Sequence, residues 1–215
     1  MTSGRVHAAR ADREVATWAL VSAATAPIAM IGGWTVAAAM QDRFDGVGET
    51  ISALAASTAS APWVMGAGLA VTGLCHVVTA SGLRPFPTAG RLLLALGGVA
   101  TAGVAALPVD LQPAAHGAAA AIAFGALSAW PAGAWRSSGQ GVLSARTARV
   151  ATSSLVGLLV VFVLELQGMT PLRGAATGAL ERLLAGTQAV WPLVVVLALR
   201  RSERHGGGRR SGPGS

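Results

Sequence analysis

Long apolar runs alternate with short polar breaks along this chain of 215 residues. Six runs are long enough to cross a hydrocarbon core of about 30 Å at about 1.5 Å per residue. None alternates apolar and polar residues with a period of two, so transmembrane strands are excluded and helices are predicted. The pattern predicts an all-α bundle of six transmembrane helices, over about residues 15–39, 62–83, 89–107, 114–135, 148–167 and 179–199.

The composition agrees with a membrane protein. The mean hydropathy is +0.57 and 12% of residues are charged, whereas soluble domains carry about 25% charged residues. The six runs leave no room for a second folded domain. The first run is longer than the apolar core of a signal peptide, so we expect it to be retained as a helix.

Arginine distribution predicts the orientation. Thirteen of the 16 basic residues lie in the two ends of the chain and in every second break, and only Arg43, Arg173 and Arg182 lie on the other side. Cytoplasmic loops carry such an excess, so both termini are predicted in the cytoplasm, in a multi-pass protein of the cell membrane. Residues 1–14 form a cytoplasmic segment, and the Gly-rich residues 200–215 are expected to be a disordered basic tail.

The net charge of +7 does not indicate nucleic-acid binding. The arginines lie at the ends of apolar runs and form no basic stripe interleaved with aromatic residues. We therefore expect membrane lipid as a partner, together with a partner membrane protein or a second copy of this chain, and no nucleic acid.

Polar residues that suggest a site concentrate on the predicted outer side. In the first outer loop, Ile51, Leu54 and Ala55 share one helical face, which predicts a short helix over the mouth of the bundle. Asp110 and His116 are close enough in sequence to form a charge-assisted pair. Such a pair could orient a catalytic base, hold a lipid headgroup or bind a metal, or it could be a structural hydrogen bond that fixes the loop.

An acid at the end of the fifth run, Glu165, is expected to face the interior, with Arg182 as its cationic partner. The candidate outer polar site consists of Glu49, Ser52, Asp110, His116, Glu165 and Arg182. His76 lies deeper, about 21 Å along its helix from the outer end. We expect it to make an interhelical hydrogen bond and not to share a metal site with His116.

No recognised catalytic, phosphate-binding or metal-binding motif occurs in the chain, so no cofactor is predicted and the catalytic residues are unknown. The leading hypothesis is a non-catalytic protein that binds a lipid or a partner. One alternative is a membrane-embedded lipid hydrolase or transferase that uses Asp110 and His116, and another is a small transporter.

Several short motifs resemble those of the DUF998 family of six-helix membrane proteins, whose function is not established. They are Phe44-Asp45 and Thr50–Leu54 in the first outer loop, Ala61–Val64 after it, Leu107–Asp110 in the second outer loop, and His116. The resemblance extends over about residues 14–201. It implies a six-helix membrane fold and assigns no reaction.

Overall fold

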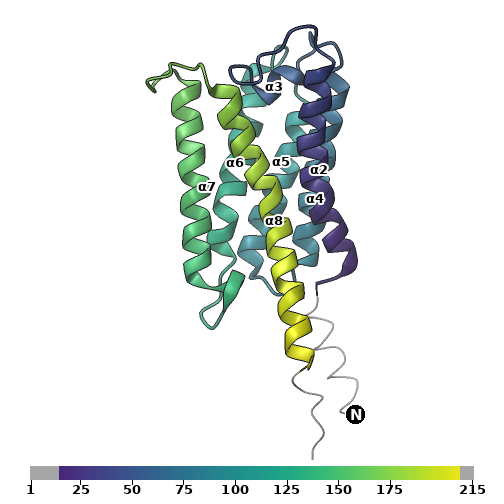
Figure 1. The fold of residues 1–215 in the computed structure, drawn as a ribbon, viewed down its shortest axis with the longest axis vertical. Helices are drawn as coiled ribbons and strands as arrows, with labels where there is room; N and C mark the ends of the chain where they lie inside the picture. Colours follow the sequence, from purple (N-terminus) through teal and green to yellow (C-terminus); the bar gives the residue numbers. More distant parts are fainter. Residues whose placement is uncertain (1–14, 209–215) are drawn as a thin grey trace, which may run out of the picture.

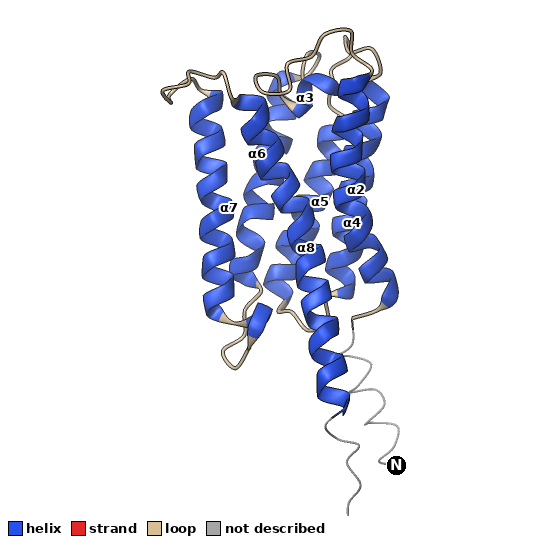
Figure 2. Ribbon diagram, viewed as in Figure 1, coloured by secondary structure: helices blue, strands red, loops and turns tan. Residues whose placement is uncertain are grey.

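The computed structural model describes residues 15–208, and these form helices joined by short loops without any strand (Figure 2). The long helices are α2 (Thr17–Ala39), α4 (Pro62–Gly82), α5 (Thr88–Ala105), α6 (Pro113–Ala129), α7 (Ala145–Leu166) and α8 (Thr177–Gly208). They run alternately up and down as one bundle (Figure 1). The prediction of an all-α membrane bundle is therefore confirmed.

Five of the long helices have the length and apolarity of membrane spans, namely α2, α4, α5, α7 and α8. The fourth predicted span is shorter than expected, because α6 ends at Ala129 and the chain continues as a 3₁₀ turn, η1 (Trp130–Gly133). Pro131 explains the change, since it has no amide hydrogen for the α-helical ladder. The count of six spans and the orientation remain predictions.

The last helix is longer than predicted. The α8 helix was expected to end near Leu199, but it continues to Gly208, so the expectation of a disordered tail from residue 200 is wrong for residues 200–208. The rest of that predicted tail, and the predicted cytoplasmic segment 1–14, lie outside the described residues. Helix α8 extends past the neighbouring helices at the end of the bundle where α2 begins (Figure 1).

Glycine allows α4 and α5 to pack with their backbones almost in contact. A Cβ atom at Gly73 would lie 2.4 Å from the carbonyl oxygen of Gly98, and one at Gly98 would lie 2.6 Å from that of Gly73. In lipid there is no hydrophobic driving force for helices to associate, so they are held together mainly by close packing. Small residues at the contacts allow this packing. This contact joins the two helices that also line the cavity described below.

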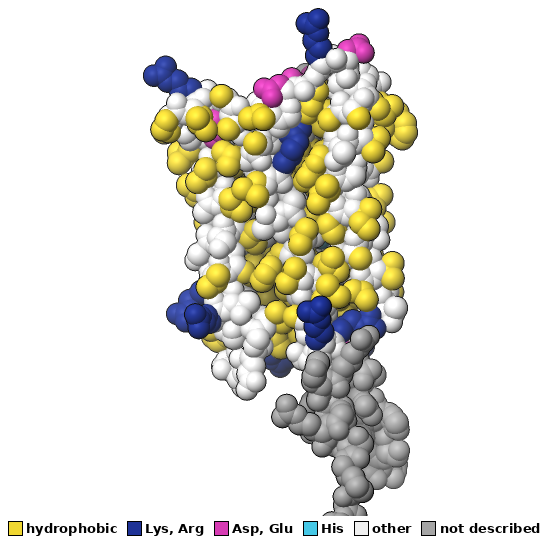
Figure 3. All heavy atoms as spheres, in the orientation of Figure 1, with side chains coloured by type: hydrophobic (Ala, Val, Ile, Leu, Met, Phe, Trp, Pro, Cys, Tyr) yellow, Lys and Arg dark blue, Asp and Glu magenta, His cyan; other side chains and the backbone are white. Residues whose placement is uncertain are grey.

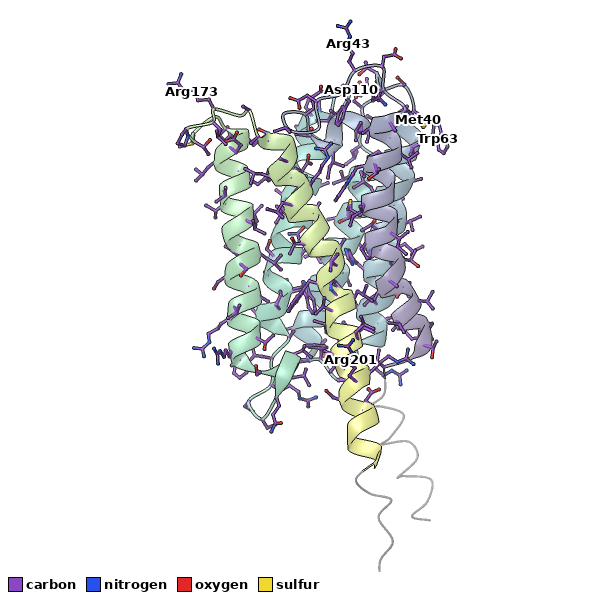
Figure 4. All side chains as sticks on the ribbon, in the orientation of Figure 1. Met40, Arg43, Trp63, Asp110, Arg173 and Arg201 are labelled. Carbon is purple, nitrogen blue, oxygen red and sulfur yellow. The ribbon has the colours of Figure 1, made fainter. Side chains whose placement is uncertain are left out.

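On the face drawn in Figure 3, acidic side chains appear at one end of the bundle only, and the surface between the two ends is mostly apolar or uncharged. Arg43, Asp110 and Arg173 lie at one end, with Trp63 close by, and Arg201 lies toward the other end (Figure 4). We call the end with Asp110 the outer end and the end with Arg201 the inner end, following the predicted orientation.

Candidate functional site

A chain of hydrogen bonds crosses the outer end of the bundle and joins α3 (Ile51–Leu54), α6 and α8. The Ser52 Oγ atom lies 2.9 Å from Nε2 of His116 and 3.4 Å from Oε1 of Glu181. His116 Nδ1 lies 2.7 Å from the Leu107 carbonyl oxygen. The sequence predicted Ser52 and His116 as site residues, and the structure brings these two together.

The short helix α3 positions Ser52. The Thr50 side chain caps α3 by accepting a hydrogen bond from the Ala53 amide at 3.2 Å, which is how threonine begins a helix. Ile51 and Leu54 are buried against the bundle, as their shared face predicted. Ser52 is therefore held below the loop, at the edge of the helix bundle.

The protonation pattern of His116 follows from its partners. The Leu107 carbonyl oxygen can only accept, so Nδ1 must carry a hydrogen. In a neutral ring Nε2 is then an acceptor, and the Ser52 hydroxyl donates to it. In a charged ring Nε2 donates to Ser52, whose hydroxyl is then free to donate to Glu181.

Sequence reasoning missed Glu181 as a site residue. Its side chain is 4% exposed, and its Oε2 accepts a hydrogen bond from the Ile51 amide at 2.5 Å. The signal was available, because an acid one turn into an apolar span is costly unless it is partnered. The neighbouring Arg182 was predicted to pair with Glu165, and no role was predicted for Glu181.

Arg182 binds the first outer loop and not Glu165. Its Nη1 donates to the carbonyl oxygens of Gly46 at 3.0 Å and Glu49 at 2.9 Å, and its guanidinium lies 5.2 Å from the centre of the Phe44 ring. Contacts to carbonyl oxygens of the loop therefore replace the expected pairing with Glu165. Every residue has a backbone carbonyl, so the sequence pattern does not reveal which ones Arg182 binds.

Backbone contacts add to this connection between loop and helix. The amides of Gly178 and Ala179 donate to the carbonyl oxygens of Gly48 and Val47. These contacts, with those of Glu181 and Arg182, attach the first outer loop to the first turns of α8. The loop thus closes the outer end of the bundle above Ser52.

Asp110 does not pair with His116. Its carboxylate accepts hydrogen bonds from the amide and the hydroxyl of Ser57, at 3.0 and 2.5 Å. These two bonds lower the pKa of Asp110 below its ordinary value of 3.8. The Asp110 side chain therefore joins the two outer loops at the surface, separately from the His116 network.

The remaining two predicted site residues organise their own loops. Glu165 is fully buried and accepts hydrogen bonds from the Thr170 hydroxyl and, at 2.8 Å, from the Ala176 amide. The Glu49 carboxylate accepts from the Asp45 amide at 3.0 Å. The side chains of neither residue reach Ser52 or His116 through a hydrogen bond among the described residues.

Below Ser52, a narrow internal cavity of about 40 Å³ extends into the bundle. Its lining is mostly apolar and includes Leu69, Ala123 and Phe124, and its polar lining comes from Ser52, His76, Thr101, Glu181 and Gln188. Pockets that bind small molecules combine these features, an apolar wall with a few convergent polar groups. Among the described residues, no lysine or arginine lines this cavity.

His76 is the polar group of the cavity that lacks a partner. Its side chain is 1% exposed, and its buried Nδ1 has no hydrogen bond. The expected interhelical bond is therefore not formed by Nδ1 within the described part of the chain. An imidazole buried without partners is costly, so a polar group of a bound molecule would stabilise it.

The residues described contain no group of three or more His, Cys, Asp or Glu side chains placed to hold a metal ion. His116 and Glu181 belong to the same hydrogen-bond network, whereas His76 lies deeper in the cavity. The arrangement offers hydrogen-bond donors and acceptors, a hydroxyl group next to an imidazole, and an apolar wall.

Comparison with known proteins identifies the family and no function. A family model described as a protein of unknown function, DUF998, matches residues 23–198. Neither the curated proteins nor the solved structures contain a match. The match covers most of the chain, including every helix that lines the cavity, and confirms the resemblance seen in the sequence. The chain belongs to the DUF998 family.

Proposed function

We propose that this protein is a six-span protein of the cell membrane, with both termini in the cytoplasm, that binds an uncharged lipid whose hydroxyl group enters its internal cavity. The observation that carries the proposal is the buried Nδ1 atom of His76, which has no hydrogen bond and lies beside a largely apolar cavity within the bundle. Apolar walls favour a lipid-like molecule, and a buried imidazole favours one polar group on it.

Charge and hydrogen-bonding capacity narrow the ligand class. The cavity is lined by the acid Glu181 and by no cation, so a phosphate group would enter without a counter-charge, at a high desolvation cost. Nδ1 of a neutral imidazole is either a donor or an acceptor, and a hydroxyl group can pair with it in either role. A neutral lipid alcohol or acylglycerol therefore fits better than a phospholipid.

Mass spectrometry of lipids that co-purify with the protein tests this proposal. Ala123 is 5% exposed and lines the cavity on α6, so Ala123→Leu is expected to fill the space and to remove the neutral lipid. Ala118 is exposed on the same helix, so Ala118→Leu is the matched control and is expected to retain it. Equal neutral-lipid content in both variants, or none in the unchanged protein, contradicts the proposal.

A second candidate function is ester hydrolysis, which one observation favours: the Ser52 hydroxyl lies 2.9 Å from an imidazole that a backbone carbonyl orients. Activated serine nucleophiles share this arrangement of hydroxyl, base and orienting group. In this candidate Ser52 is the partner of His116, a role that the sequence pattern had predicted for Asp110.

The chemistry would run through an acyl-serine. As Ser52 Oγ bonds to the ester carbonyl carbon, its proton passes to His116 Nε2, and the same proton then leaves with the alcohol when the ester C–O bond breaks. Water, deprotonated by His116, then releases the acid and restores Ser52. Leu107 keeps the second ring nitrogen protonated throughout.

Labelling with a fluorophosphonate, followed by intact-mass and peptide analysis, distinguishes this candidate from simple binding. We expect one adduct at Ser52, abolished in Ser52→Ala and slowed in His116→Asn, whereas Ser57→Ala leaves it unchanged. A protein that binds neutral lipid but acquires no adduct supports the binding function alone.

A further inference from the structure

Seven arginines whose side chains are described lie at the inner end, and their partners separate them into two classes. Arg91 donates to the carbonyl oxygens of Ala80 and Ser81. Arg136 donates to that of Pro85, and Arg200 donates to the Thr17 hydroxyl. Arg84 and Arg201 also have partners. The other two, Arg146 and Arg149, have neither a hydrogen bond nor an ion pair with any residue in the described part of the chain, and both are exposed.

Both unpartnered arginines lie in the first turns of α7 and line grooves on the side of the bundle. Arg146 lines a groove of about 480 Å³ between α7 and α8, whose wall includes Val150, Leu155 and Trp191. Arg149 lines a second groove on the other side of α7, together with Trp135. Each groove thus combines a cation near the inner end with a largely apolar wall.

Helix α7 stands at the edge of the bundle, beside α6 and α8 (Figure 1). Its most apolar stretch is the least buried of the five candidate spans, at 22%. The grooves on its two sides therefore face the lipid and not another protein segment among the described residues. In a membrane, lipid acyl chains would fill these two grooves.

The electrostatics of this region favour an anion. At the inner end the one acid with a described side chain, Glu203, accepts a hydrogen bond from the Val15 amide and is not beside α7. The N-terminus of α7, capped by Ser144, adds the positive end of a helix dipole at the same place. Guanidinium groups bind phosphate oxygens in a bidentate fork.

We propose that the groove between α7 and α8 binds an anionic phospholipid of the cytoplasmic leaflet, with its phosphate on Arg146 and an acyl chain along Val150 and Trp191. Arg149 contributes a second cation on the neighbouring groove. This site is independent of the internal cavity: it selects a negatively charged headgroup, whereas the cavity has no cation and selects an uncharged ligand.

Nanodiscs made of equal amounts of phosphatidylglycerol and phosphatidylcholine provide the test. The ratio of the two lipids retained on the released protein is read by native mass spectrometry. Each basic residue near an anionic headgroup is worth about a fivefold preference. We therefore expect Arg146→Gln to lower the phosphatidylglycerol preference about fivefold, and Arg146→Gln with Arg149→Gln to lower it further.

Arg136→Gln is the matched control, because it removes one charge from the same end but from a side chain that binds Pro85. We expect it to leave the preference unchanged, whereas Arg146→Lys, which keeps the charge but not the bidentate guanidinium, should lower the preference less than Arg146→Gln does. An equal loss in Arg136→Gln and Arg146→Gln would show attraction by net charge alone and overturn the site. Retention of both lipids in equal amounts by the unchanged protein would also overturn it.

The same spectra, recorded from nanodiscs that also contain the neutral lipid, keep the two lipid sites distinct. Loss of phosphatidylglycerol preference in the arginine variants leaves the neutral lipid of the cavity in place, whereas Ala123→Leu removes the neutral lipid and leaves the preference. A circular dichroism melt of each variant shows that the fold is intact. An unfolded double variant would be replaced by Arg146→Lys and Arg149→Lys, in which reduced preference at unchanged charge still identifies guanidinium binding.

Discussion

At the scale of single residues, His116 holds the outer site together because it has a partner on each ring nitrogen. Replacing it by alanine would leave the Ser52 hydroxyl and the Leu107 carbonyl without that partner. Since His116 is 4% exposed, we expect His116→Ala to lower the free energy of unfolding by about 1–3 kcal/mol. Thermal or denaturant unfolding in detergent measures this.

Asp110→Asn serves as the comparison for His116→Ala, because Asp110 lies in the second outer loop without touching the His116 network. An exposed contact of this kind contributes little. A loss of stability from Asp110→Asn as large as that from His116→Ala would mean that the two residues act as one pair after all.

The contact between Asp110 and Ser57 predicts a pH dependence confined to acid. Hydrogen bonds to the ionised carboxylate lower its pKa below 3.8, so the contact is fully formed above that pH and is lost as the pH falls through the lowered pKa. The amide resonance of Ser57, followed by nuclear magnetic resonance, should titrate with a midpoint below 3.8. A midpoint above 3.8 would show that the carboxylate is not stabilised by Ser57.

At the scale of helices, the α4–α5 contact depends on the absence of a side chain at Gly73. A methyl group there would overlap the Gly98 carbonyl, so Gly73→Ala should destabilise the protein by about 1–3 kcal/mol. Gly103 on α5 has open space around its Cα, and Gly103→Ala should be neutral or stabilising. Unfolding measurements that rank the two variants in the opposite order would contradict this packing.

How far the sequence predicts the helices depends on what sets each boundary. Where a boundary follows a change in hydropathy it was predicted well: α2 ends at Ala39 and α4 begins at Pro62 as expected. Pro131 ends α6 early through a missing amide, which a hydropathy window does not register. The basic residues after Leu199 continue α8, because hydrogen bonding along a helix does not require an apolar sequence.

The site was predicted less completely than the helices, for a physical reason. Ser52 and His116 were both chosen, yet the bond that joins them spans 64 positions and depends on how α3 meets α6. Proximity in sequence favoured Asp110 as the partner of His116 instead. Partners such as the Leu107 carbonyl and the Ile51 amide belong to the backbone, which every residue has, so no residue type identifies them.

At the scale of the whole molecule, the orientation can be tested with single cysteines in a Cys75→Ala background, because Cys75 is the one cysteine of the chain. Asp42 and Ser137 are exposed at opposite ends of the bundle. A maleimide that does not cross membranes should label Asp42→Cys in intact cells and Ser137→Cys only after permeabilisation. The reverse result would invert the orientation, and labelling of both in intact cells would contradict the span count.

The attachment of the first outer loop to α8 affects how a molecule could reach the cavity. With Gly178, Ala179 and Arg182 bound to that loop, a route from the aqueous phase would require several hydrogen bonds to break together. A lipid ligand would exchange sideways instead, through the fatty interior of the membrane. Its occupancy would then follow its mole fraction in the bilayer, so diluting the protein in buffer would not empty the site, whereas diluting the ligand with inert lipid would.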